Sequence, residues 1–200
     1  MKFVGLVGSN YDQSYNRKLL EFIRRNFKFK FELEVLEIDE VPMFNQDEKW
    51  DESFQLRFLY NKITRADGVI IATPEHNHTI SASLKSVLEW LSYEVHPFEN
   101  KPVMITGASY GTLGSSRAQL QLRQILNAPE IKATVLPDEF LLSHSLQAFD
   151  KNGDLVDLDV IKKLDAIFDD FRIFVKVTEK LRNAQELLRK DAEDFDWENL

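Results

Sequence analysis

Short runs of apolar residues alternate with longer segments of helical periodicity along most of the chain. Several of the runs are rich in β-branched residues and end at glycine or at polar turn residues, as strands do. Near-continuous apolar runs are typical of parallel strands that helices cover on both faces. The pattern predicts five strands, within residues 2–9, 31–38, 67–74, 101–109 and 131–136.

The segments between these runs place apolar residues three or four positions apart. In residues 16–27, Leu20, Ile23 and Phe27 recur at the spacing of one helix face. The same spacing predicts three further helices and a long closing helix. Their ranges are 51–66, 81–92, 115–126 and 154–181.

Strands that alternate with helices form βαβ units, whose crossovers are right-handed. We therefore predict an α/β fold, a doubly wound five-stranded parallel sheet with helices on both faces. Residues 1–181 are assigned to this domain. Residues 182–200 are rich in alternating charges, so we expect a charged C-terminal helical extension or acidic tail.

Composition narrows the classes of function. The chain has no cysteine, which excludes disulfides and thiolate chemistry, so redox chemistry would need a bound cofactor. A formal net charge of −8 argues against a nucleic-acid partner. No stretch approaches the roughly 20 apolar residues of a membrane helix, and the start does not resemble a signal peptide. We expect a cytoplasmic protein without membrane contact.

Ligands of open parallel sheets bind beyond the carboxyl ends of the strands. The first loop at this edge, residues 8–17, offers the hydroxyls of Ser9, Ser14 and Tyr15 and the amide of Asn16. The unpaired N–H groups and the dipole at the following helix N-terminus favour a phosphate. The alternative is that Ser14 or Asn16 merely caps the helix.

The second loop carries Pro74, Glu75, His76, Asn77 and His78. A metal site is disfavoured because the other two histidines form no ligand-spaced cluster with this pair. A catalytic histidine pair lacks a nucleophile, since no G-x-S-x-G motif occurs. A plain surface turn and a loop that lies against a flat ligand both remain open.

The third loop, residues 107–117, is rich in glycine. Gly107 and Gly111 allow close approach of the backbone to a ligand, and Ser109 and Tyr110 add polar and aromatic contacts. Arg117 is placed either to bind an anion or to form a structural ion pair. Neither G-x-G-x-x-G nor the P-loop motif is present, so a mononucleotide is favoured over a dinucleotide or ATP.

Segments 8–20, 73–92 and 101–126, in this order and spacing, resemble the NADPH-dependent FMN reductase family of flavodoxin-like proteins, which includes quinone, azo-dye and chromate reductases. The resemblance covers about residues 2–150 and implies the flavodoxin-like strand order 2-1-3-4-5. It implies that the first loop holds the FMN phosphate and that the other two enclose the isoalloxazine. The cofactor-binding residues it implies are Ser9, Ser14, Tyr15, Asn16, Pro74, Glu75, His76, Asn77, His78, Gly107, Ser109, Tyr110 and Gly111.

The function implied by the resemblance is that of an NAD(P)H-dependent oxidoreductase. NADPH or NADH would give hydride to bound FMN, which would reduce a small electron acceptor such as free flavin, a quinone or an azo compound. No catalytic side chain and no metal are expected, because flavin N5 carries the hydride. The alternative is a non-enzymatic flavodoxin-like electron carrier, or a flavin-binding component that serves a partner protein.

Two positions depart from the family pattern. Tyr11 stands where the family commonly has arginine, so phosphate affinity must depend more on N–H donors, on hydroxyls and on Arg17. His76 stands where the family usually has tyrosine beside the flavin.

The helix over residues 81–92 has a wide apolar face that includes Leu84, Leu88 and Trp90. Similar family members use this helix to dimerise, so we expect a homodimer or a dimer of dimers. The alternative is a core helix whose apolar face is buried entirely within one chain.

Overall fold

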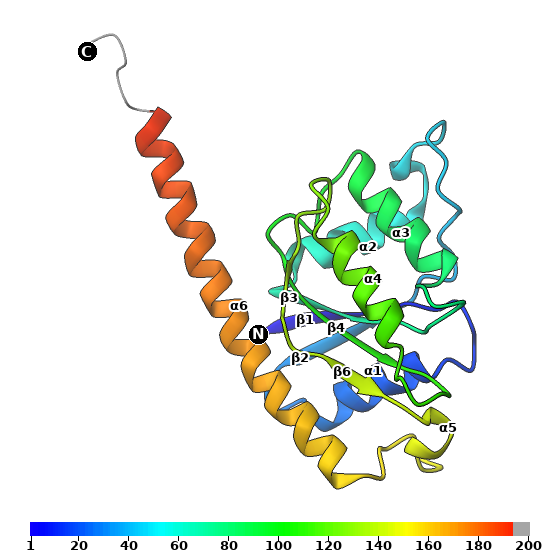
Figure 1. Ribbon diagram of the computed structural model, residues 1–200. Coiled ribbons are helices and arrows are strands. Elements are labelled where there is room, and N and C mark those ends of the chain that lie inside the picture. Colours follow the sequence, from blue (N-terminus) through cyan, green and yellow to red (C-terminus); the bar gives the residue numbers. More distant parts are fainter. Residues whose placement is uncertain (194–200) are drawn as a thin grey trace.

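The computed structural model describes residues 1–193, with side chains described as far as residue 188. Its centre is a parallel sheet in the order β2-β1-β3-β4-β5, with β6 also paired to β4, which confirms the predicted flavodoxin-like α/β fold (Figure 1). The strands are β1 (Lys2–Val7), β2 (Glu32–Leu36), β3 (Gly68–Ala72), β4 (Pro102–Ala108), β5 (Thr134–Val135) and β6 (Phe140–Leu142).

The fifth strand position differs from the prediction of one strand over residues 131–136. β5 pairs only with Pro102 and Val103, and β6 continues the same edge beside Thr106–Ala108. The last backbone hydrogen bond from this segment to β4 runs from the Leu136 N–H to the Val103 carbonyl. Pro137 follows directly, and proline has no N–H to donate to the neighbouring strand. The fifth strand position of the sheet therefore ends at Leu142, the last residue of β6. The segment that follows Leu142 lies at the ligand-binding edge of the sheet.

Helices cover both faces of the sheet. On one face lie α1 (Tyr15–Asn26) and α6 (Leu158–Glu193), and on the other lie α2 (Phe54–Arg65), α3 (Ala82–Tyr93) and α4 (Ser116–Leu126). Two short helices, η1 (Trp50–Glu52) and α5 (Ser145–Ala148), complete the described part. Side chains along β1 alternate between the two apolar cores, as the pleat of a strand requires.

The apolar face of α3 is buried within the chain. Leu84, Leu88 and Trp90 are at most 1% exposed. The indole N–H of Trp90 donates to the carbonyl of Pro42 at 2.9 Å, and the ring packs edge-on against Phe44. The structure thus favours the core-helix alternative for α3, and the side chains that suggested a dimer through this helix are not available to a second chain.

The closing helix and the first part of the expected helical extension form one element. A single helix, α6, runs through the boundary set at residues 181 and 182. Its first half lies on the sheet, and its second half projects away from the body (Figure 1). Residues 194–200, the end of the expected acidic tail, lie outside the described residues. Across residues 1–193, no helix combines the length and apolarity that crossing a membrane requires.

Aromatic packing fixes the first half of α6 to the sheet. Phe171 is 0% exposed and its ring centroid lies 5.0 Å from that of Phe3 on β1. We predict that Phe171→Ala lowers the free energy of unfolding by about 3–5 kcal/mol, because it removes a buried ring and leaves a cavity. Phe29→Ala is the matched control, since Phe29 is 90% exposed, and its effect should stay within about 0.5 kcal/mol. Urea unfolding measures both, and equal effects would contradict the placement of α6.

Candidate active site

Four segments meet at the carboxyl ends of the strands around a cavity of about 390 Å³. This volume lies in the usual range of cofactor and small-molecule sites. Most of the predicted cofactor-binding residues border it: Ser9, Ser14, Tyr15, Asn16, Pro74, Glu75, His76, Ser109 and Tyr110. Three further residues also border it: Tyr11, Ala108 and Ser145.

The N-terminus of α1 faces this cavity. Ser14 caps the helix, because its Oγ accepts the N–H of Arg17 at 3.4 Å, and Ser9 Oγ accepts the N–H of Tyr11 at 3.2 Å. No acceptor in residues 1–193 receives the N–H groups of Tyr15 and Asn16. Capping and anion binding are therefore compatible, since the cap leaves two donors and the helix dipole for a phosphate.

The side-chain amide of Asn16, which was expected at the phosphate, is used within the chain. Asn16 is 2% exposed, with Nδ2 donating to the carbonyl of Ala108 at 3.2 Å and Oδ1 accepting the N–H of Ala108 at 2.8 Å. Both ends of the amide are used within the chain. Asn16 therefore joins α1 to the end of β4, and its backbone N–H, rather than its side chain, is available to a ligand.

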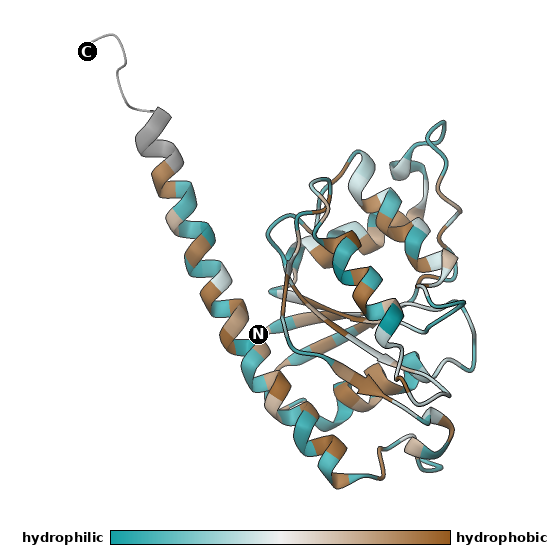
Figure 2. Ribbon diagram, in the orientation of Figure 1, coloured by the Kyte–Doolittle hydropathy of each residue, from teal (hydrophilic) through white to brown (hydrophobic). Residues whose placement is uncertain are grey.

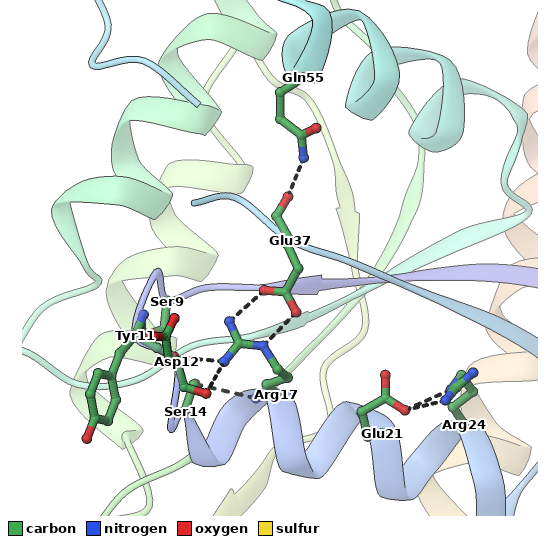
Figure 3. A network of polar contacts seen from close by, with 9 residues as sticks. All are labelled: Ser9, Tyr11, Asp12, Ser14, Arg17, Glu21, Arg24, Glu37 and Gln55. Atoms are coloured by element: carbon green, nitrogen blue, oxygen red, sulfur yellow. Dashed lines mark hydrogen bonds and ion pairs between the residues drawn. The ribbon is translucent and has the colours of Figure 1, made fainter. Parts of the chain in front are cut away.

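Arg17 is also committed within the chain, contrary to the expectation that it helps to hold the phosphate. Its Nε and Nη2 donate to the carboxylate of Glu37 at 2.6 and 2.8 Å (Figure 3). Its Nη1 donates to the carbonyls of Tyr11 and Asp12 at 2.8 and 2.7 Å. The bonds to Glu37 raise the pKa of the Arg17 guanidinium above its ordinary value, so it stays charged. Arg17 thus fixes the first loop against the end of β2.

The second loop forms a tight turn. His76 and Thr79 exchange backbone hydrogen bonds of 2.9 and 3.0 Å, and Asn77 and His78 between them have φ of 50° and 67°. Two central residues with positive φ are typical of a type I′ turn. Asn77 and His78 are exposed at its tip and do not border the cavity. Their predicted place beside the flavin is thus not supported, whereas Pro74, Glu75 and His76 do border the cavity.

Glu75 supplies the N-terminal cap of α4. Ser115 precedes this helix with φ of 66° and makes no side-chain capping bond. Instead, the carboxylate of Glu75 accepts the N–H groups of Arg117 and Ala118 at 3.1 and 3.5 Å and pairs with the Arg117 guanidinium at 3.3 Å. The ion-pair alternative for Arg117 is the one that the structure shows.

The third loop is partly structural. Gly107 lies within β4, where a Cβ would collide with Ser115 Oγ and the Thr73 carbonyl, so close packing rather than a ligand requires glycine. Gly111 also lies outside the cavity lining. Tyr110 does border the cavity, and its ring packs edge-on against Tyr15 at 5.5 Å.

The fourth segment was missed by sequence reasoning. It follows β6 and is held to the third loop by two bonds, from Ser109 N–H to the Leu142 carbonyl and from Ser145 N–H to the Ser109 carbonyl, both 3.0 Å. The apolar run at residues 140–142, followed by Ser-His-Ser, was the available signal.

A larger hollow of about 570 Å³ lies elsewhere, between α2 and the strands β1 and β2. It is lined mainly by charged side chains and by Phe54 and Phe58. None of the four segments at the carboxyl edge borders it, so it is not the candidate active site.

A family model described as NADPH-dependent FMN reductase matches residues 1–147. The chain belongs to this family. This FMN reductase is 44% identical to NADH:(hydroxy)cinnamate reductase subunit CrdA of Vibrio ruber, over 99% of this chain and 98% of that protein. It is 42% identical to NADH-dependent flavin reductase subunit 2 of Lactobacillus johnsonii, over 90% of this chain and 100% of that protein.

Among solved structures, this FMN reductase is similar to FerB, a flavoenzyme NAD(P)H:(acceptor) oxidoreductase from Paracoccus denitrificans. The TM-score is 0.76 at 26% identity, over 90% of this chain and 97% of that one. Family membership confirms the predictions of an NAD(P)H-dependent oxidoreductase and of FMN as its cofactor.

The Asn16 contact gives a direct test of how the site is held together. We predict that Asn16→Ala lowers the free energy of unfolding by about 2–4 kcal/mol, because it leaves the buried N–H and carbonyl of Ala108 without partners. Asn10→Ala is the control, since Asn10 is exposed in the same loop. Urea unfolding of the apoproteins measures both. If Asn16→Ala were as stable as the wild type, the bonds from Asn16 to Ala108 would not stabilise the fold, and Asn16 would serve only as a ligand contact.

Proposed function

We propose that this FMN reductase takes electrons from NADH and passes them to a small acceptor such as free flavin or a quinone. The observation that carries the proposal is the cavity at the carboxyl edge, where the free N–H groups of Tyr15 and Asn16 lie on the α1 dipole. NADH is proposed as donor because the relatives from Vibrio and Lactobacillus carry it in their names.

The residues at the cavity fit FMN. The phosphate would be bound by the N–H groups of Tyr15 and Asn16 with the hydroxyls of Ser9 and Ser14, which are nearly fully buried. No lysine or arginine borders the cavity, so neutral donors and the helix dipole would carry phosphate recognition. The flavin ring would lie between the second and third loops.

The work of the chain itself is binding and orientation. Bound FMN would supply the hydride chemistry, accepting from the nicotinamide and delivering to the acceptor. Tyr11 and Tyr110 border the cavity with 57% and 58% of their surface exposed, and so offer aromatic surfaces at its open side. Donor and acceptor would enter there in turn, which gives ping-pong turnover.

The enzymatic proposal predicts turnover without a further protein. Purified protein loaded with FMN should show flavin absorbance and oxidise NADH in the presence of a quinone at about 1–1,000 s⁻¹. Initial rates at several quinone concentrations should give parallel double-reciprocal lines. FMN binding without NADH oxidation would favour the alternative, a carrier that serves a partner protein, and absence of FMN binding would refute both.

We further propose that the protein is a cytoplasmic homodimer, with α6 rather than α3 as its interface. Five residues at spacings of three or four form an outer stripe on α6, consisting of Ile173, Val177, Leu181, Ala184 and Leu188. All are exposed, with 56–69% exposure for the four larger side chains. At 100° per residue they fall within an arc of about 80°, on the side away from the core.

A second copy is the proposed occupant of the outer stripe. The stripe continues onto the half of α6 that projects from the body, where the rest of the chain leaves it uncovered (Figures 1 and 2). Apolar residues at spacings of three and four are typical of helices that pair lengthwise. The names of the Vibrio and Lactobacillus relatives describe each as a subunit, which also supports an assembly.

Leu181→Lys tests this interface. Light scattering after gel filtration should give the mass of two chains for the wild type and of one chain for Leu181→Lys, because a charge in the stripe must be desolvated on pairing. Leu120→Lys is the matched control, since Leu120 is 67% exposed on α4, and it should remain dimeric. A monomeric wild type would contradict the homodimer and leave the stripe to a different subunit.

A further inference from the structure

One hydroxyl beside the cavity has no hydrogen-bond partner. Ser145 is 0% exposed, and its Oγ meets no donor or acceptor among the described residues. Ser145 is nevertheless one of the residues that border the cavity. A buried hydroxyl is unfavourable unless another group replaces the water it has lost, and most such groups in proteins have a partner. The unpaired Oγ therefore indicates that its hydrogen-bond partner is an atom of the ligand that binds in this cavity.

The backbone holds Ser145 in place without a ligand. Its N–H donates to the carbonyl of Ser109 at 3.0 Å, and the N–H of the preceding His144 donates to the carbonyl of Gly111 at 3.1 Å. The segment after β6 is thus built onto the third loop. Because α5 has only four residues, the inference depends on the side chain of Ser145 and not on the helix terminus.

The hydrogen bonds also indicate which end of the cavity Ser145 serves. Ser109, its backbone partner, directly follows Ala108, and Ala108 is bonded to Asn16 in the first turn of α1. The second loop is bonded to α4 instead, through Glu75. Ser145 is therefore held to the start of the third loop, which Asn16 joins to the α1 N-terminus, where the anion is expected.

We propose that Ser145 donates a hydrogen bond to a phosphate oxygen of bound FMN. The proposal rests on the proposed FMN site and adds a fourth segment to it. The hydroxyl has no exposed surface, so it reaches the phosphate by rotation about the Cα–Cβ bond between staggered rotamers. The cavity lining contains no lysine or arginine, so each neutral donor at the phosphate carries a larger part of its recognition.

Flavin binding to the apoprotein tests the proposal. Ser145→Ala and the matched control Ser143→Ala are titrated with FMN and with riboflavin, which lacks the phosphate, and flavin fluorescence gives each Kd. Ser143 lies two residues away and outside this cavity. Ser145→Ala should raise the Kd for FMN about ten-fold, as expected for a lost bond to a charged group, and leave the Kd for riboflavin unchanged. Ser143→Ala should change neither.

Thermal unfolding of the apoproteins separates a binding role from a structural one. Loss of an unpaired buried hydroxyl should leave the Tm of Ser145→Ala equal to or above that of the wild type. Unchanged FMN binding, an equal loss of riboflavin binding, or a fall in apoprotein Tm would each overturn the proposal. In all three cases wild-type FMN binding would still stand, whereas a wild type that binds no FMN would refute the proposed function as well.

Discussion

The site depends on buried polar side chains that join loops from different strands. Asn16 bonds both backbone groups of Ala108, which ties the first loop to the third. Ser81, the N-cap of α3, donates to the carbonyl of Gly8 at 2.8 Å and so ties the second loop to the first. Glu75 closes the triangle by capping α4 from the second loop. A cavity lined by loops can keep a defined shape only if such bonds fix the loops to one another, because loops by themselves are mobile.

These bonds determine which groups are left for a ligand. The one arginine in the first loop is used by Glu37 and by two loop carbonyls, so its charge maintains the loop rather than reaching the cavity. Neutral donors and the α1 dipole remain at the anion end. Such donors bind a phosphate more weakly than a bidentate arginine does, but they require no buried charge when the site is empty.

Much of the fold was predictable because each β-branched run and each helical stripe is a local pattern. The strand order followed from the resemblance and agrees with the observed pairing. The fifth strand was predicted only in part: β5 lies within residues 131–136, but β6, which follows Pro137, is too short to carry a clear periodic signal. The segment containing Ser145 follows β6, so it lies beyond the end of the predicted strand. The single helix α6 continues through the boundary at residues 181 and 182, so the described part of the predicted extension belongs to the closing helix.

The structure brings most of the predicted cofactor-binding residues together around one cavity, but it commits several of their side chains to the scaffold, and the reason is physical. A motif identifies residue types that a local geometry needs, and an asparagine that bonds a neighbouring backbone looks the same in sequence as one that bonds a phosphate. Asn16, Glu75 and Gly107 all serve the scaffold in this structure. Ser145 belongs to no motif, yet it has the unpaired hydroxyl. The atoms that bind a ligand are those that the scaffold leaves without partners, and only a count of hydrogen bonds in three dimensions separates the two groups.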